Sequence, residues 1–550
     1  MALVLAASLL RHLSYPLLWN DEAETVAYAQ RILSFGYPKI SDGRNLVYDL
    51  DAPLAVGRKE DSDAYIGSVW GQYYFATLGV WAAQGVDDLH ARTARFRLPF
   101  VLAGMTGLAA LALALAMSFG ARRAAASWSV AGFLGLAALS TSLALHLREA
   151  RYHGLTIGLQ GLLVLVYLRH AILGRGRALP CTASTTLLLL LLYNTFPPTA
   201  FAWAAALGVD VAVAALRGPA SRNARLRRLA VGWLPLLLFG LLVLPLARFY
   251  ETAEMTRWYW RFNPDTAFWL RRSRVLLDFL LWREPLAAVV AVKLLAEALH
   301  AAARAPLPGI TPRLRLSRLL ALAAVLELLL ITSIPWIFDR YAMPALPLLA
   351  ASLILDVGLA LELARSLAPA PRLAARLALA GALVFGLALI LPAKREELEG
   401  RLAELREPVL GPLDFVIPRL RSLRDDPSSL VIATNYETSS YIVYLGSRML
   451  VGYTGANRMA DLAESPDVII SRKNTRRFRA ELAAYWNRER FVRETFPVVD
   501  LPYNNIPQLT PAGVIKVMHQ FFTPRPTRDE DRLEIWVRAD LEPMSTPGSR

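Results

Sequence analysis

The sequence predicts a polytopic α-helical membrane protein of about 11 transmembrane helices, with a C-terminal α/β soluble domain on the outer face of the membrane. Three observations lead to this fold class. Of the 550 residues, 55% are hydrophobic, and the mean hydropathy is +0.36. Runs rich in Leu, Ala and Val recur up to Pro392, and each is close to the roughly 20 residues that cross a bilayer. Beyond Pro392, short apolar segments alternate with charged helical ones.

The apolar runs define the expected transmembrane segments. The first run contains Arg11 and His12 and lacks a small-residue cleavage site, so we interpret it as a short first span rather than as a cleavable signal peptide. The expected spans are residues 2–18, 98–119, 126–146, 155–168, 184–197, 200–216, 230–247, 285–303, 319–334, 345–363 and 374–392.

The charges of the connecting segments predict the orientation of the chain. One alternate set of loops, which includes Arg122-Arg123 and residues 304–318, is short, rich in arginine and almost free of acids. The positive-inside rule places this set in the cytoplasm. The other set, which includes residues 20–95, then faces outside. We therefore expect a multi-pass protein of the plasma (inner) membrane, with a cytoplasmic amino terminus, a transmembrane domain at 1–392 and an extracytoplasmic domain at 393–550.

Composition also argues against other classes of protein. The net charge of +15 is concentrated in short loops between apolar runs, as expected for membrane topology, so we expect no nucleic-acid partner. A single cysteine, Cys181, excludes an internal disulfide framework. His146 and His153 lie seven residues apart, which is poor spacing for a metal-binding pair.

The long first outer loop is expected to contribute to a site at the membrane surface. Residues 19–28 follow the first span directly and carry three carboxylates. Residues 24–35 show an amphipathic helical pattern that ends at Gly36. The aromatic-rich residues 65–84 form a second such pattern, and we expect both helices to lie in the headgroup layer, where they can hold a lipid headgroup. The alternative that residues 65–84 cross the membrane stays open.

The last 150 residues or so have the pattern of a soluble α/β domain that is large enough to have its own core. Residues 430–433, 468–470 and 534–537 are short apolar runs bounded by polar residues, which predicts strands. Residues 394–406, 412–424 and 475–486 are expected to be helical.

The order of several short motifs resembles the integral-membrane GT-C glycosyltransferases. The motifs are Asp21-Glu22 at the start of an amphipathic helix, Asp49-Leu50-Asp51-Ala52-Pro53, Arg148-Glu149-Ala150-Arg151-Tyr152 at the outer end of a span, and Asp339-Arg340-Tyr341 before Pro344 and Pro347. Within that superfamily, the layout is most similar to the bacterial relatives of protein O-mannosyltransferases and of the lipid A aminoarabinose transferases. The resemblance implies transfer of a sugar from a polyprenyl phosphate donor to a lipid, glycan or protein acceptor on the outer face.

The resemblance also implies roles for residues of the first loop. Asp21 matches the first-loop acid that acts as general base, and Asp51 matches a second acid near the sugar and the acceptor. This chain has Ala52 where the aminoarabinose branch has a lysine, so another cation of the loop is expected to replace it. The candidates for that cation are Arg44, Arg58 and Lys59, and further candidates for substrate binding are Glu22 and Tyr28.

Elementary chemistry supports the same assignment. An acceptor hydroxyl or amine must lose a proton as it attacks the anomeric carbon, and a carboxylate within hydrogen-bond reach can take it. The leaving phosphate needs cationic stabilisation, for which arginine is suited by its bidentate geometry. The candidates are Arg148 and Arg151, expected about one helical turn apart on one face, and Arg340. Tyr152 and Tyr341 beside them are expected to stack on the substrate and to offer it a hydroxyl.

Each of these residues also has a structural interpretation that stays open. Asp21 and Glu22 suit a helix N-terminus, where carboxylates are favourable. Arg148 and Arg151 suit an interfacial anchor, and Arg340 suits an ion pair with Asp339. No cofactor is expected, but some GT-C branches use a divalent cation, so Asp21 and Asp51 remain alternative metal ligands.

Two other function classes remain alternatives to a transferase. A transporter or flippase of a lipid-linked sugar would carry charged residues inside its spans and an internal repeat, and Glu327 is the one such charge noted. An inactive scaffold that presents the outer domain would tolerate replacement of the first-loop acids.

Overall fold

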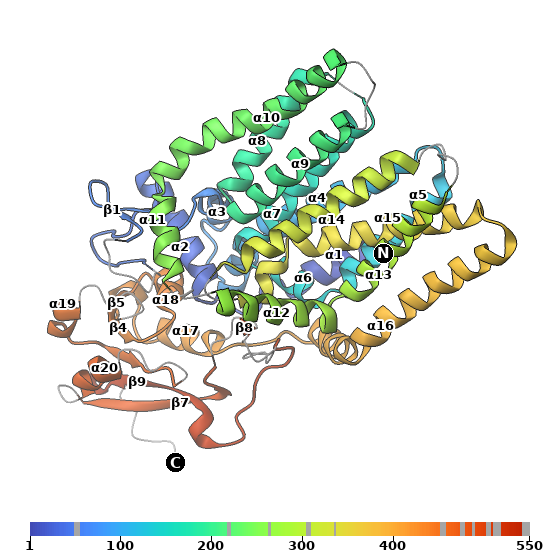
Figure 1. Ribbon diagram of the computed structural model, residues 1–550. Coiled ribbons are helices and arrows are strands. Elements are labelled where there is room, and N and C mark those ends of the chain that lie inside the picture. The colour runs from blue at the N-terminus through green and yellow to red at the C-terminus, as the bar shows by residue number, and fades with distance from the viewer. Residues whose placement is uncertain are drawn as a thin grey trace. The chain divides into compact units, whose positions relative to one another are not determined.

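Figure 1 shows the computed structural model, which describes the chain apart from residues 49–55, 176, 217–221, 262–265, 304–309, 335–336, 452–457, 474–478, 487–489, 502–507, 510–518 and 542–550. The chain divides into two compact units. Unit 1 comprises Met1–Arg11, Phe100–Arg401 and Ile506–His519, and unit 2 comprises His12–Pro99, Leu402–Asn505 and Gln520–Arg550. The first outer loop thus belongs to the same unit as most of the C-terminal residues, and the domain boundary expected at 392/393 remains a prediction.

Unit 1 is built almost entirely of helices. The short strands β3 (Ile337–Phe338) and β8 (Gln508–Leu509) pair antiparallel, and β3 leads into the 3-10 helix η2 (Asp339–Ala342). The helices that contribute to unit 1 are α1 (Ala2–Leu10), α4 (Leu89–Ser118), α5 (Arg123–Leu139), α6 (Thr141–His146), α7 (Tyr152–Tyr167), α8 (Ala178–Tyr193), α9 (Pro197–Leu216), α10 (Arg222–Phe249), α11 (Thr252–Trp260), α12 (Thr266–Arg283), α13 (Leu286–Ala302), α14 (Ile310–Ile331), α15 (Ala345–Arg365) and α16 (Pro369–Arg406).

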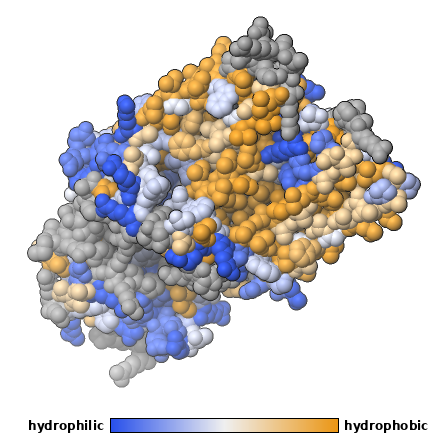
Figure 2. Space-filling model, in the orientation of Figure 1, coloured by the Kyte–Doolittle hydropathy of each residue, from blue (hydrophilic) through white to orange (hydrophobic). Residues whose placement is uncertain are grey.

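Several of these helices have the length and apolar composition of membrane spans. Among the described residues, six such helices are found: α4, α7 with its extension to Ile172, α9, the part of α10 from Val231, α15 and α16. Only 11% of the apolar window of α10 and 22% of that of α16 is buried within the protein. Figure 2 shows hydrophobic side chains covering much of the surface of the unit 1 helices. The exposed apolar surface of these helices is therefore suited to contact with lipid hydrocarbon rather than with water.

The expected spans coincide with helices, but several boundaries differ. Residues 126–146 form two helices, because α5 ends at Leu139 and α6 begins at Thr141. The first expected span contains only the nine residues of α1, which ends directly before Arg11; the next residue, His12, has a positive φ of 53°. Because α1, α5 and α8 are shorter than the six helices named above, the total of eleven spans remains a prediction.

Glycines allow α4 and α7 to pack closely. A Cβ atom on Gly107 would lie 2.1 Å from the carbonyl oxygen of Ile157, and one on Gly161 would lie 2.3 Å from that of Gly107. Small residues of this kind let the backbones of membrane helices approach one another. The contact fixes α7, whose first turn carries Tyr152 and His153.

The C-terminal part of unit 2 folds as an α/β domain around a five-stranded sheet of order β5-β4-β6-β9-β7. β4 pairs parallel with β5 and β6, while β9 pairs antiparallel with β6 and β7. The predicted strands are confirmed as β4 (Val431–Thr434), β6 (Val468–Ile470) and β9 (Arg532–Arg538). Two strands of this sheet were not predicted, β5 (Arg448–Val451) and β7 (Phe491–Val499). The domain's helices include α17 (Leu413–Arg421), α18 (Thr438–Leu445), α19 (Arg458–Ala463) and α20 (Arg479–Trp486).

The predicted amphipathic helix of the first loop is confirmed as α2 (Asn20–Phe35). It ends at Gly36, which has a φ of 85° and donates its N–H to the carbonyl of Ile32. β1 (Arg58–Lys59) and β2 (Ala64–Tyr65) form a small hairpin, and α3 (Gly71–Ala82) occupies part of the second predicted helix.

Hydrogen bonds fix the residues that precede α2. Within unit 2, the N–H of Leu17 donates to Asp414 at 3.2 Å, and the N–H of Leu18 donates to the Tyr444 hydroxyl at 3.0 Å. Ser440 donates to the carbonyl of Leu18 at 2.9 Å. These contacts fix the start of α2 and therefore the position of Asp21 within unit 2.

The buried Asp414 carboxyl predicts a pH dependence of stability. Burial raises its pKa to about 6, against the opposing effects of backbone N–H donors and His90. Because the folded state disfavours the charged form, this group should lower the free energy of unfolding as pH rises from about 4 to about 6. We expect Asp414→Asn to flatten that decrease.

The measurement is chemical unfolding across this pH range, with Glu407→Gln, which replaces an exposed carboxylate, as the matched control. A native decrease that persists unchanged in Asp414→Asn would contradict the assignment.

Candidate functional site

Unit 1 brings together the two predicted arginine motifs. Arg148 and Arg151 lie in the turn that joins α6 to α7, and Arg340 lies in η2. The expectation that Arg148 and Arg151 share one face of a helix is wrong, because residues 147–151 are not helical and Arg151 has extended backbone angles. The turn nevertheless places both arginines directly before α7.

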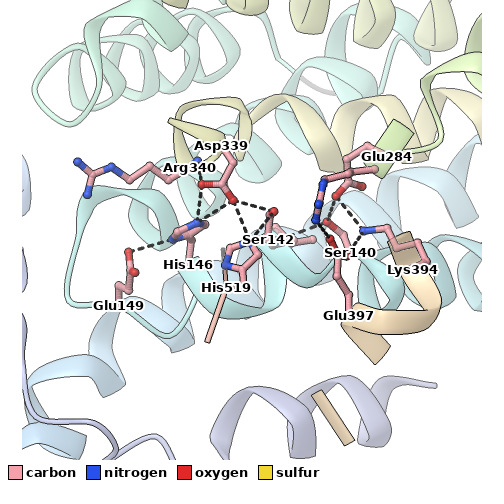
Figure 3. A network of polar contacts seen from close by, with 12 residues as sticks. Ser140, Ser142, His146, Glu149, Glu284, Asp339, Arg340, Lys394, Glu397 and His519 are labelled. Atoms are coloured by element: carbon pink, nitrogen blue, oxygen red, sulfur yellow. Dashed lines mark hydrogen bonds and ion pairs between the residues drawn. The ribbon is translucent and has the colours of Figure 1, made fainter. Parts of the chain in front are cut away.

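A buried polar network connects the two motifs (Figure 3). The Asp339 carboxylate is 3.3 Å from Nε2 of His146 and 3.1 Å from Nε2 of His519, and it accepts a hydrogen bond of 2.8 Å from Ser142. The other ring nitrogen of His146 lies 3.2 Å from Glu149. The chain of contacts thus runs from the arginine turn through His146 to the residue next to Arg340.

The electrostatics of the network follow from burial and from the histidines. Asp339 and His146 are both fully buried. Burial by itself would raise the pKa of Asp339, but His146 and His519 outweigh it and lower that pKa well below the usual value. Asp339 is therefore a stable anion whose partners are imidazoles, and Figure 3 shows the Arg340 guanidinium directed away from it.

Aromatic stacking makes a second connection. The rings of Tyr152 and Phe196 stack at 4.8 Å between centroids, and those of Phe196 and Tyr341 stack at 6.5 Å. The Arg151 guanidinium lies 5.7 Å from the Tyr152 ring, and that of Arg340 lies 5.5 Å from the Tyr341 ring. Both predicted tyrosines therefore stand beside their arginines and contact one common phenylalanine.

The cluster carries concentrated positive charge at low exposure. Arg148 is 7% exposed and Arg340 is 5% exposed. Arg151 and Arg340 both lie within electrostatic range of His153, which is buried, and Arg148 lies within range of Arg401. Arg151 and Arg340 thus lie near the same buried imidazole, and two guanidiniums placed in this way suit an anion.

A second polar network lies beside the first one in Figure 3. Lys394 donates to Glu284 at 3.2 Å and to Glu397 at 2.9 Å, and Ser140 donates to Glu284 at 3.0 Å. Arg283 also pairs with Glu397 at 2.8 Å. Because two cations then face two carboxylates, this network fits a structural role between the start of α6 and α16.

Four residues that contribute to this site were not predicted. The spacing of His146 and His153 was considered only for metal binding, Phe196 belongs to none of the motifs, and the approach of His519 depends on a contact across 180 residues of chain. The one available signal was the position of His146 beside the Arg148 motif.

Unit 2 holds the first-loop candidates. Asp21 is half-buried in the first turn of α2. The next residue, Glu22, is fully buried and forms a bidentate pair with Arg97, with N–O distances of 2.8 and 2.6 Å. Arg97 also donates to the carbonyls of Leu13 and Tyr15. This geometry gives Glu22 a structural role at the start of α2, while its role in substrate binding remains a prediction.

The remaining first-loop candidates have mixed surroundings. Tyr28 is buried, donates its hydroxyl to the carbonyl of Val47 and stacks on Tyr65 at 4.6 Å. Arg58 pairs with Asp63 at 2.7 Å, and Lys59 is half-buried in β1. Asp51 lies outside the described residues. Among the residues that the structure does describe, no group of three or more His, Cys, Asp or Glu side chains is arranged to hold a metal ion.

No protein-family model and no curated protein matches this chain. The chain is similar to solved structures of ArnT from Cupriavidus metallidurans, in the apo state (14% identity, 98% of this chain and 96% of that chain, TM-score 0.48) and bound to undecaprenyl phosphate (13% identity, 98% and 97%, TM-score 0.48). It is also similar to the oligosaccharyltransferase AglB from Archaeoglobus fulgidus in complex with an inhibitory peptide and a dolichol-phosphate (12% identity, 88% and 70%, TM-score 0.47).

At this identity and TM-score, the likeness itself assigns no activity to the chain, which has to be argued from its own residues.

The pair of Glu22 with Arg97 predicts a large effect on stability. Glu22→Gln leaves a buried guanidinium without its carboxylate, which typically costs about 3–5 kcal/mol. Glu60→Gln, which changes an exposed carboxylate of the same loop, should change the free energy of unfolding by less than about 0.5 kcal/mol. Denaturant unfolding of the ligand-free protein measures both. Full stability of Glu22→Gln, combined with weakened substrate binding, would instead support the role predicted from sequence.

Proposed function

We propose that this protein is an inverting glycosyltransferase that moves a sugar from a polyprenyl phosphate donor to a lipid, glycan or protein acceptor on the outer face of the plasma membrane. One observation carries the proposal. Arg151 and Arg340, from segments almost 190 residues apart, are connected through the contact of His146 with Asp339 and through the stacked rings of Tyr152, Phe196 and Tyr341.

The arginines suit the donor phosphate. As the sugar leaves, the phosphate diester becomes a monoester and gains negative charge, which guanidiniums stabilise more strongly in a buried site than in water. Each such charge-assisted hydrogen bond is worth roughly 1.5–3 kcal/mol. In this proposal Arg148, Arg151 and Arg340 bind the phosphate, and the histidine-carboxylate network positions them without contacting it.

The aromatic rings suit the other parts of the donor. Sugar rings and prenyl chains both present apolar faces that pack on flat aromatic side chains. Tyr152 and Tyr341 offer such faces beside the arginines, together with hydroxyl groups for hydrogen bonds to the sugar. The two arginine–tyrosine motifs thus offer groups for the phosphate, the sugar and the prenyl chain of the donor.

We assign the general base to Asp21. The acceptor oxygen or nitrogen attacks the anomeric carbon, the bond from that carbon to the phosphate oxygen breaks, and its electron pair leaves with the phosphate. The acceptor proton passes to the carboxylate, and this single displacement inverts the anomeric centre. Asp51 is proposed to position the sugar or the acceptor, and Arg44, Arg58 or Lys59 to supply the first-loop cation. The mechanism needs no metal ion, so a chelator should leave turnover unchanged.

A specific observation favours a second candidate function, a flippase of lipid-linked sugars. Glu327 in α14 is buried and accepts a hydrogen bond from Thr199. Lys293 in α13 pairs at 2.8 Å with the buried Asp356 in α15. Charges inside apolar helices are costly and often mark transport pathways. Lys293 and Asp356 both lie in expected spans, so the expectation that Glu327 is the one charge inside the spans is wrong.

Transfer of radiolabelled sugar tests the proposal and separates it from the rival. Membranes that contain the native chain should turn over one member of a panel of mannosyl, glucosyl and arabinosyl polyprenyl phosphates. Asp21→Asn should reduce this turnover at least about a hundredfold, because general base catalysis contributes about that much. Glu60→Gln is the control. Unchanged turnover in Asp21→Asn would contradict the assignment of the base, and movement of sugar-lipid across the bilayer without turnover would favour the flippase.

A further inference from the structure

Unit 1 contains a cavity that the proposed reaction does not use. Its volume is about 670 Å³, which is within the size range of small-molecule sites. It is formed where α4 ends, α5 begins and α15 ends, together with Arg313 near the start of α14. The arginine motif of the candidate site follows the opposite end of α5 and the short helix α6, so the 17 residues of α5 lie between the two places.

The lining of this cavity is strongly basic. Among the described residues that line it, Arg122, Arg123, Arg313 and Arg365 face one carboxylate, that of Glu362, which gives these residues a net charge of +3. A single oxygen of Glu362 lies 2.5 Å from both Arg122 and Arg313. One carboxylate therefore serves two guanidiniums, and the arrangement retains excess positive charge.

The two remaining arginines are available to a ligand. Arg123 and Arg365 are both exposed. Neither has an acidic partner among the residues that the structure describes, in contrast to the many paired arginines elsewhere in the chain. Free guanidiniums beside a charged pair are well placed for bidentate contacts with phosphate oxygens.

Apart from Ser129, the rest of the lining is apolar, and part of it is exposed. Trp128 is 79% exposed and Leu361 is 38% exposed, while Ile354 and Val357 are half-buried. Arg313 lies 5.0 Å from the ring of Phe119. Gly358 leaves room for that ring, since a Cβ there would be 3.1 Å from it. An exposed tryptophan next to arginines is typical of the layer between headgroups and hydrocarbon.

We infer that this cavity binds the phosphate headgroup of an anionic glycerophospholipid, with an acyl chain lying along the apolar residues of α5 and α15. A free phosphate ion would use the arginines but not Trp128, Leu361 or Val357, so the combination favours a lipid. Basic pockets between transmembrane helices are a common form of lipid site. The loop that carries Arg122 and Arg123 belongs to the arginine-rich set that the sequence predicts to be cytoplasmic, and anionic lipids are concentrated in that leaflet.

Native mass spectrometry of the full-length protein, titrated with dioleoyl phosphatidylglycerol in detergent, tests this inference. The double variant Arg123→Gln/Arg365→Gln should weaken binding of the first lipid at least about tenfold, or about 1.4 kcal/mol. The matched control is Arg175→Gln/Arg177→Gln, which removes the same charge from exposed residues of another basic loop and should bind like the native chain. Dioleoyl phosphatidylcholine should bind more weakly than phosphatidylglycerol to the native protein.

Two further measurements keep the inference open to contradiction. Leu361→Glu introduces a carboxylate at an exposed lining position and should also weaken the binding of phosphatidylglycerol. Because the position is exposed, the unfolding temperature of this variant should stay near that of the native protein. Competition with inorganic phosphate should displace the lipid only weakly. Equal lipid binding by the native, double-variant and control proteins would overturn the inference, and so would displacement by inorganic phosphate as effective as that by phosphatidylglycerol itself.

Discussion

The contact between His146 and Asp339 is the interaction on which the candidate donor site depends. Each group would be costly to bury alone, and together with Glu149, Ser142 and His519 they form a network in which opposite charges lie close together. Because Asp339 is the neighbour of Arg340, and His146 lies just before the Arg148 turn, one buried contact sets the distance between two cationic segments. Loss of this contact would separate the arginines without removing any of them.

The parts of the fold that follow local rules were predictable from sequence. The amphipathic pattern that ends at Gly36 predicted α2, and the short apolar runs predicted β4, β6 and β9. Span boundaries were less predictable, because hydropathy does not show where a chain turns: Ser140 interrupts the predicted segment 126–146, and its side chain accepts a hydrogen bond from the N–H of Leu143 at the start of α6. β7 was missed because charged residues such as Arg493 and Glu494 alternate through it, and their cross-strand partners on β9 are remote in sequence.

The candidate site was predictable in its residue types and not in its geometry. Arginine beside tyrosine in two motifs pointed to phosphate and sugar chemistry, and the structure places both pairs around Phe196. The connecting histidines could not be inferred, since their partners depend on how α6, η2 and the residues near 519 meet. Similarly, the sequence does not distinguish Glu22 from the other acids of the first loop. In the structure, Glu22 is buried and paired with Arg97, whereas Asp21 is half-buried. The basic cavity near Arg123 likewise combines α5 with α14 and α15, which are remote from α5 in sequence.

Direct binding of a polyprenyl phosphate that carries no sugar tests the central claim, that the arginines of unit 1 hold the donor phosphate. Native mass spectrometry can compare the native protein with Arg340→Gln and with Asp21→Asn. We expect Arg340→Gln to weaken binding at least about tenfold, whereas Asp21→Asn should bind like the native chain because a general base for the acceptor has no contact with the phosphate. Native affinity in Arg340→Gln would mean that the donor phosphate binds elsewhere, which would contradict the role proposed for the arginines.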